Sequence, residues 1–312
     1  MPAQFTARHA SLRAVHPLKS HGRYAYSAIT RRRDYSWPRS RRLAVYVGFH
    51  VEQFDFGAGA APALGARNPE PDVLNYSWRD YGSRVGVWRC LNLFEDLKLR
   101  VGALVNTACY DHCPEVVDAF AKRGDELIGH GHSSSLRQGE LREEDEKWLL
   151  TYCRARIQKE SAVEAAGWLS PGISETVRTL DLLTETGYRY TLDWSHDDQP
   201  IEMRTRSGAL WSIPYPQELN DVSMILARQM DACDFADMVV DNFNEMLEQS
   251  HNQPLVMGIA LHPYVVGQPY RLRHLRRALE HIYREKRVWW TTPGAICEWV
   301  SEKSGTDPDF FA

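Results

Sequence analysis

Eight short runs of β-branched and aromatic residues constrain the fold of this chain more than any other feature of its sequence. They span residues 42–49, 99–106, 125–131, 165–171, 188–194, 209–216, 254–263 and 287–293. Runs that are this short and this continuously apolar are typical of strands buried on both faces of a sheet. Segments of helical period separate many of them, at residues 83–98, 114–123, 144–164, 174–187, 236–250 and 272–285.

The alternation of strands with helices predicts an α/β fold. Helical crossovers join parallel strands with a right-handed connection, and seven or eight such units close or nearly close a barrel. We therefore expect a single-domain, distorted (β/α) barrel with seven or eight strands over residues 41–304. An extended N-terminal arm at residues 1–40 and a C-terminal tail at residues 305–312 are expected to flank it.

The charge balance argues against a nucleic-acid or membrane partner. The chain has 37 Lys and Arg residues against 41 Asp and Glu residues, whereas nucleic acid and anionic lipid require a basic surface. An Arg-rich stretch at 29–42 is interleaved with Tyr35 and Trp37, which indicates an arm packed on the domain or on a neighbouring subunit. The sequence shows neither a signal peptide nor an apolar run of membrane-spanning length, and its six cysteines fit no disulfide framework. We therefore expect a cytoplasmic protein.

Polar side chains with catalytic chemistry follow most of the predicted strands. In a parallel barrel the carboxyl ends of the strands meet on one rim, where active sites lie. The side chains expected on this rim are His50, Glu52, His130, His132, Ser170, Asp193, Trp194, Tyr215, Gln217 and His262. The sequence contains no Gly-rich phosphate loop, nucleophile elbow or HExxH pattern. The Gly-, Ala- and Pro-rich segment at 57–72 is either a surface connection or a lid over the rim.

Six short motifs carry a resemblance to a known family. In chain order they are FHVEQF, YGSRVGVWR, IGHGHSSS, LSPGIS, LDWSHDDQP and ALHPYVVGQPYR. Over about residues 24–300 the chain resembles the polysaccharide deacetylase (NodB-homology) family, and within it the branch of cofactor-independent allantoinases and cyclic-imide hydrolases. The resemblance implies a NodB-type barrel and hydrolysis of a C–N bond. Together with the aromatic N-terminal arm, it also indicates a homo-oligomer.

The motifs depart from the pattern of family members that remove acetyl groups. The resemblance places Glu52 at the position of the acidic metal ligand and His130 at that of the first ligand histidine. Val51 falls where the catalytic base belongs, and Ser134 falls where the second ligand histidine belongs. Loss of a ligand weakens a three-ligand metal site severely, so we expect that no cofactor is required. The alternative is a zinc ion on His130 and His132 with Glu52, or with His50 in place of Glu52, because residues two apart on a continuing strand point to the same face.

The same residues suggest a mechanism for opening a ring. Such a reaction needs an activated water, a stabiliser for the oxyanion and an acid for the leaving nitrogen. We expect Glu52 or His130 to activate the water, and His262, which matches the catalytic histidine of the family, to protonate the leaving group. The residues expected to bind substrate are Arg84, Ser170, Trp194, Asp198, Tyr215 and Gln217. Ser170 is also expected to offer donors to the oxyanion.

The favoured function is hydrolysis of a small cyclic amide or imide of the allantoin, hydantoin, succinimide, glutarimide or phthalimide type. An imide suits a site without a metal, because its second carbonyl activates the reacting one and makes the nitrogen a good leaving group. One alternative is a metal-dependent N- or O-deacetylase of an acetylated saccharide. Another is a non-catalytic protein that binds a small ligand.

Overall fold

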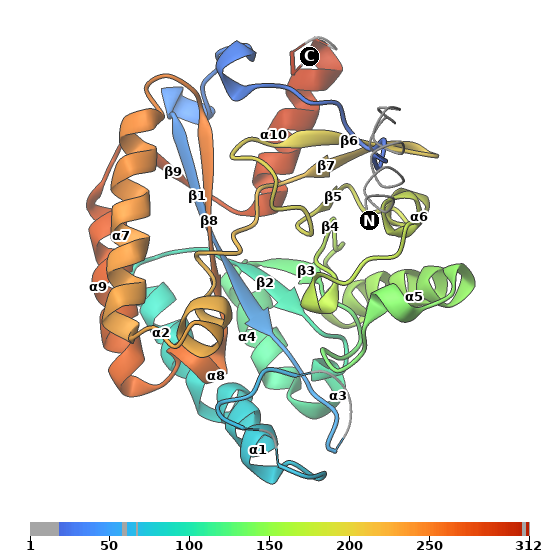
Figure 1. Cartoon of the computed structure of the whole chain (residues 1–312), viewed down its shortest axis with the longest axis vertical. Helices are drawn as coiled ribbons and strands as arrows, with labels where there is room; N and C mark the ends of the chain where they lie inside the picture. The colour runs from blue at the N-terminus through green and yellow to red at the C-terminus, as the bar shows by residue number, and fades with distance from the viewer. Residues whose placement is uncertain (1–18, 58–60, 67, 308–309, 312) are drawn as a thin grey trace, which may run out of the picture.

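The computed structural model describes residues 19–57, 61–66, 68–307 and 310–311, and their strands form one curled sheet (Figure 1). Its order is β6-β7-β5-β4-β3-β2-β1-β8, and β9 also pairs with β1. The strands are β1 (Leu43–Val51), β2 (Gly102–Val105), β3 (Glu126–Gly129), β4 (Gly167–Trp168), β5 (Tyr190–Thr191), β6 (Ile201–Thr205), β7 (Gly208–Ser212), β8 (Leu255–Leu261) and β9 (Val288–Trp290).

The strand pattern confirms the predicted fold class. Each of the eight apolar runs overlaps one strand, and these strands pair in parallel. The strand β6 was not predicted; it pairs antiparallel with β7 through a tight hairpin at the sheet edge. Its residues IEMRT alternate in character and are mostly solvent-accessible, so they give no continuous apolar signal. The curled sheet forms a half-barrel of NodB type, which is a distorted (β/α) barrel.

The helices lie mostly on the convex side of the sheet (Figure 1), whereas the last helix of the chain buries Ile296, Cys297 and Val300 in the core on the concave side. They are α1 (Val73–Tyr81), α2 (Val87–Asp96), α3 (Cys109–His112), α4 (Pro114–Arg123), α5 (Glu143–Ser161), α6 (Thr179–Glu185), α7 (Ala232–Gln249), α8 (Pro263–Val266), α9 (Pro269–Arg284) and α10 (Pro293–Thr306). The helix α9 buries Leu275, Ala278, Leu279 and Ile282, whose spacing places them on one face. The six predicted helical segments correspond to α2, α4, α5, α6, α7 and α9, whereas α1 and α10 were not expected.

The side chains of β1 divide the core into two layers. Leu43, Val45, Val47, Phe49 and Val51 belong to the core beneath the helices. Ala44 and Tyr46 belong to the second core, on the concave side of the sheet. Because successive side chains of a strand point to opposite faces, His50 also faces the concave side.

The described part of the N-terminal arm, residues 19–40, packs on the barrel. Trp37 is buried, and its Nε1 donates to the carbonyl oxygen of Leu255 at 3.0 Å. Arg23 and Arg32 form salt bridges with Asp181 and Asp197, at 2.7 and 2.6 Å. Residues 1–18 of the predicted arm lie outside the described part of the chain. Among the described residues, no helix combines the length and the apolar character that crossing a membrane requires.

A close approach of two backbones holds α8 against the rim of the sheet. The π-helical segment Gly82–Gly86 precedes α2 and packs on α8. A Cβ atom on Gly86 would overlap the carbonyl oxygen of Pro263. Only glycine fits there, and the contact fixes the turn that follows β8 and carries His262 and Tyr264.

We predict that Gly86→Ala lowers the free energy of unfolding by about 1–3 kcal/mol, the usual cost of forcing extra atoms into a packed contact. The overlapping atoms belong to the backbone and cannot rotate away, so the cost lies toward the upper end of this range and outweighs the roughly 1 kcal/mol that alanine gains over glycine in helix propensity. Urea unfolding followed by circular dichroism measures the change. Gly65→Ala is the matched control, because a Cβ atom at Gly65 has open space around it. Equal stability of the two variants would contradict the packing role of Gly86.

Candidate active site

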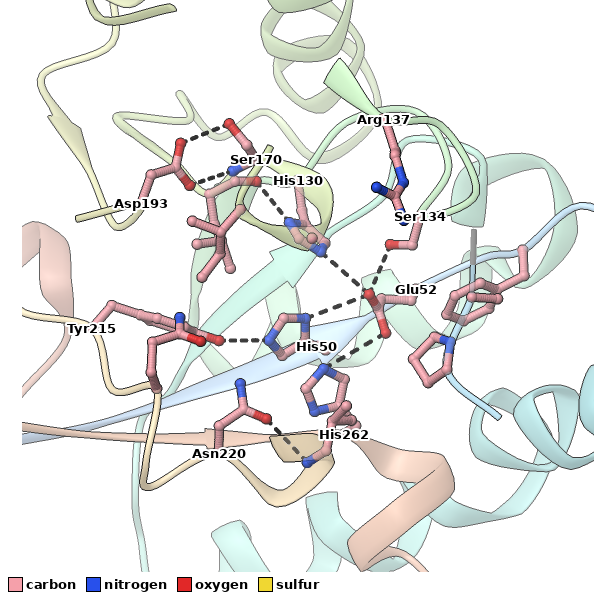
Figure 2. A pocket seen from close by; sticks show the side chains of 18 of the residues that line it. His50, Glu52, His130, Ser134, Arg137, Ser170, Asp193, Tyr215, Asn220 and His262 are labelled. Carbon is pink, nitrogen blue, oxygen red and sulfur yellow. Dashed lines mark hydrogen bonds and ion pairs between the residues drawn. The ribbon is translucent and has the colours of Figure 1, made fainter. Parts of the chain in front are cut away.

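A cavity of about 520 Å³ opens at the carboxyl ends of the strands (Figure 2). Its polar and charged lining consists of His50, Glu52, His130, Ser134, Arg137, Ser170, Asp193, Ser195, Tyr215, Gln217, Asn220 and His262. Its apolar lining includes Phe54, Ala61, Pro62, Leu169 and Ile173. The predicted rim is therefore a pocket with one polar end and an apolar wall.

The carboxylate of Glu52 lies at the centre of the polar end (Figure 2). Its Oε1 accepts a hydrogen bond from Ser134 Oγ at 2.7 Å and lies 3.3 Å from His130 Nε2. Its Oε2 accepts from the hydroxyl of Tyr264 at 3.0 Å and lies 3.9 Å from His262 Nε2. Burial alone would raise the pKa of Glu52, but the hydrogen bond with His130 and the nearby His50 imidazole bring the pKa well below its usual range. The carboxylate is therefore ionised.

His50 joins this centre because β1 continues through Val51. Residues two apart on a strand share a face, so His50 and Glu52 both point into the pocket. Val51 points the other way and is buried in the core beneath the helices. The position that the family resemblance assigned to a catalytic base therefore does not face the pocket.

The His50 side chain has one satisfied and one unsatisfied nitrogen. Its Nε2 lies 2.8 Å from the Tyr215 hydroxyl, and its ring stacks on that of His262 with centroids 3.8 Å apart. Burial, with the nearby His262, lowers the pKa of His50 to about 3, so the imidazole is neutral. Its buried Nδ1 has no hydrogen-bond partner and lies 3.6 Å from Glu52 Oε1. A buried polar atom without a partner is costly, and here it faces the other donors of the site.

These donor atoms fit a divalent metal ion. His130 Nδ1 lies 2.7 Å from the carbonyl oxygen of Leu169, which can only accept, so Nδ1 is the donor in this hydrogen bond and Nε2 is the nitrogen that faces Glu52 and could bind an ion. Donor atoms of His50, Glu52 and His130 lie within 4.8 Å of one another. Two imidazoles and a carboxylate are a ligand set that zinc uses in hydrolases.

His132 does not belong to this cluster, which corrects the predicted metal set. The strand β3 ends at Gly129, and the positive φ of 71° at Gly131 turns the chain before His132. The His132 ring lies instead beside Tyr152, with its Nδ1 3.0 Å from Thr107 Oγ1. His50 takes the place that the prediction gave to His132.

A buried aspartate orients His262. Asp221 Oδ1 lies 2.6 Å from His262 Nδ1, and Asp221 Oδ2 accepts from the backbone N–H of His262 at 2.8 Å. The imidazole therefore keeps a proton on Nδ1 and presents Nε2 to the pocket. Burial opposes its charge, but the Asp221 carboxylate raises the pKa of His262 above its ordinary value. The sequence analysis missed Asp221, because it lies in a connection without periodicity.

Only some of the predicted substrate-binding residues line the pocket. Ser170, Tyr215 and Gln217 line the pocket. Trp194 and Asp198 line two neighbouring cavities, of about 800 and 420 Å³. These two therefore face away from the polar centre around Glu52.

Arg84 lies outside the pocket as well. Its Nε donates to Asp80 Oδ2 at 2.5 Å, and its side chain is 75% exposed. Arg84 therefore forms an exposed salt bridge and does not line the pocket, where we expected it to bind substrate.

Residues of the 57–72 segment form one wall of the pocket. Ala61 and Pro62 line the cavity. Arg79 Nη1 donates to the carbonyl oxygen of Pro62 at 2.8 Å, and the backbone N–H of Leu64 donates to Asn75 Oδ1 at 2.8 Å. The described part of the segment is thus fastened to α1 and narrows the pocket; residues 58–60 and 67 lie outside the described part.

Two carboxyl groups share a hydrogen bond between the pocket, which Asp193 lines, and the neighbouring cavity, which Glu175 lines. Asp193 accepts from the N–H and the hydroxyl of Ser170, at 2.7 and 2.6 Å. Both donors of Ser170 are therefore directed away from the oxyanion position that we expected them to serve. Burial, reinforced by the Asp193 charge, raises the pKa of Glu175 to about 10, so Glu175 holds the proton of the pair at neutral pH.

No protein-family model matches the chain. It is 29% identical over 299 residues to the putative polysaccharide deacetylase of Schizosaccharomyces pombe, covering 86% of this chain and 92% of the yeast protein. The structure of the PuuE allantoinase matches with a TM-score of 0.81 at 22% identity, over 95% of this chain and 99% of the other. A probable polysaccharide deacetylase from Pseudomonas aeruginosa PAO1 matches with a TM-score of 0.78 at 24% identity, over 85% and 93%. The chain thus has the polysaccharide deacetylase fold, which the allantoinase shares.

We predict that Glu175→Gln stabilises the protein at neutral and alkaline pH but not at pH 4. Between the ordinary pKa of a Glu side chain and about 10, the folded chain binds a proton that the unfolded chain releases, so its stability falls as pH rises through this window. The amide keeps the hydrogen bond to Asp193 without that proton. Unfolding free energies from pH 4 to pH 9 measure the effect. Glu302→Gln, at an exposed acid on α10, is the control and should leave the pH profile unchanged.

Proposed function

We propose that this chain is a hydrolase that opens a C–N bond in a small cyclic amide or imide. The observation that carries the proposal is the arrangement of Glu52 and His262, whose Oε2 and Nε2 atoms lie 3.9 Å apart in a cavity of about 520 Å³. A carboxylate and a proton-bearing imidazole so close together are a pair suited to moving a proton from water to a leaving group. The size of the cavity and its apolar wall suit a small ring better than a polymer.

In the proposed reaction Glu52 accepts the proton of the attacking water. Its carboxylate is ionised, and Ser134 and Tyr264 hold it by hydrogen bonds. His262, oriented by Asp221, donates a proton to the nitrogen as the C–N bond breaks. The nitrogen of an imide is a good leaving group, so a single imidazole acid suffices.

Asn220 is the proposed donor to the developing oxyanion. Its Oδ1 accepts from the backbone N–H groups of Val222 and Ser223, at 3.0 and 3.3 Å. This fixes the orientation of the amide, because the oxygen is engaged and the Nδ2 group is left to face the pocket, which Asn220 lines (Figure 2). An N–H group held in this way stabilises negative charge without reorganising.

His50, Glu52 and His130 are the residues that would hold a divalent metal. Such an ion, when bound, acts as a Lewis acid on a carbonyl oxygen. Tyr215 at His50 and the Leu169 carbonyl at His130 would keep the two imidazoles in their orientation, as partners of metal ligands do elsewhere. From the sequence we predict that turnover requires no cofactor. The competing hypothesis is that turnover requires bound zinc.

The deacetylase of an acetylated saccharide is the second candidate. The ligand set of His50, Glu52 and His130 favours it, because removal of an acetyl group from an unactivated amide gains more from a metal than imide opening does. A non-catalytic binding protein is supported least. Simple ligand binding has no use for a histidine held by a buried carboxylate, as His262 is by Asp221.

We predict that the purified chain opens at least one ring in a panel of allantoin, hydantoin, succinimide, glutarimide and phthalimide, assayed after metal stripping and again with zinc. His262→Ala should lower kcat by about 10²–10⁴-fold while binding of the ring persists, because the variant loses only proton transfer. His112→Ala, at an exposed histidine of α3, is the control. Hydrolysis of N-acetylglucosamine oligomers, with none of the rings opened, would contradict the proposal.

We predict that the chain binds about one equivalent of zinc, and that His50→Ala or His130→Ala abolishes tight binding. His132→Ala should leave the stoichiometry unchanged, because His132 lies outside the ligand cluster. Metal content after gel filtration and the visible absorption of the Co²⁺-loaded protein measure this without reference to activity. Loss of metal in His132→Ala together with retention in His50→Ala would restore the ligand set expected from the sequence.

A further inference from the structure

We infer that Arg137 selects ring substrates that carry a carboxylate, an inference that rests on the proposed ring-opening function. Arg137 is the sole Arg or Lys among the described residues that line the pocket. Figure 2 shows it on the Ser134 side of Glu52, opposite His262. It therefore places a positive charge at the end of the pocket remote from the proposed acid.

The charge of Arg137 is not neutralised by the acids of the pocket. Glu52 is engaged by Ser134, Tyr264 and the imidazoles, and Asp193 is engaged by Ser170. Among the described residues, no hydrogen bond or ion pair reaches the guanidinium of Arg137. A cation without a protein partner in a pocket is available to an anionic group of the ligand.

The backbone on both sides of Arg137 is anchored. On one side, the N–H of Ser134 donates to the carbonyl oxygen of Gln53 at 3.0 Å. On the other side, the buried Gln138 donates to Glu146 at 2.8 Å and accepts from Trp168 Nε1 at 3.1 Å. The backbone that presents Arg137 is thus fixed, and only its exposed side chain has to be ordered when it binds an anion.

A carboxylate is the anion that suits this position. The planar guanidinium forms two parallel hydrogen bonds with a carboxylate, and such charge-assisted pairs are stronger than neutral ones. Phe54, Leu169 and Ile173 supply an apolar wall for the ring itself. The substrate class is therefore a cyclic amide or imide with an anionic side chain, bound with its carboxylate at Arg137 and its reacting bond toward Glu52 and His262.

The test compares two ligands of nearly the same shape, hydantoin-5-acetic acid and hydantoin-5-acetamide. We expect the wild-type protein to favour the acid by at least about tenfold in kcat/KM, mainly through KM. Arg137→Gln should remove this preference and leave the amide within about twofold of wild type, whereas Arg137→Lys should retain part of it. Arg84→Gln, which removes an exposed arginine outside the pocket, is the matched control.

The outcomes separate this inference from the proposed function. If the wild type opens both hydantoins equally, or if Arg137→Gln affects both equally, the carboxylate selection is wrong and the ring hydrolase stands. If neither ring opens, calorimetric titration of the same two ligands decides. Tighter binding of the acid by the wild type, lost in Arg137→Gln, supports selection by Arg137, and equal binding overturns it.

Discussion

The alternation of side chains along β1 is the constraint on which the whole site depends. The strand pairs with β8 on one side and with β2 and β9 on the other, so its register is fixed along its length. A slip of one residue would move His50 and Glu52 into the core beneath the helices and bring Val51 into the pocket. The pairing of the strands thus determines which side chains point into the pocket.

The buried carboxylate of Glu52, which directly follows β1, requires hydrogen-bond donors, because a buried charge is costly unless it is hydrogen-bonded. Hydrogen bonds come from Ser134 and His130 in the loop after β3 and from Tyr264 at the start of α8. The neutral His50 ring on β1 lies beside them, 3.6 Å from the carboxylate. The imidazoles are in turn fixed by a backbone carbonyl or a tyrosine hydroxyl. An arrangement held in this way keeps its dipoles oriented before a substrate arrives, which is the condition for electrostatic stabilisation of a transition state.

The sequence correctly predicted those parts of the structure in which apolar residues follow a short, regular pattern. The eight parallel strands were predictable because they are continuously apolar, whereas β6 is a polar edge strand that gives no such signal. Residues two apart on a strand share a face, and this rule was used to place His132 beside His130. It fails there because the chain turns at Gly131, but it holds for His50 on β1. Asp221 and Arg137 lie in connections where no period applies, so only the folded chain brings them to the pocket.

The pocket therefore has two ends with different physical characters. At one end His262 is tied to Asp221 and faces Glu52, and at the other Arg137 has a charge that no described residue neutralises. The segment that carries Ala61 and Pro62 limits the width between them, because its carbonyl and amide groups are fastened to α1. A ligand in such a pocket is oriented by its ends as well as by its shape. Orientation of this kind converts binding energy into correct placement of the reacting bond, which is the contribution that a small, rigid cavity makes to catalysis.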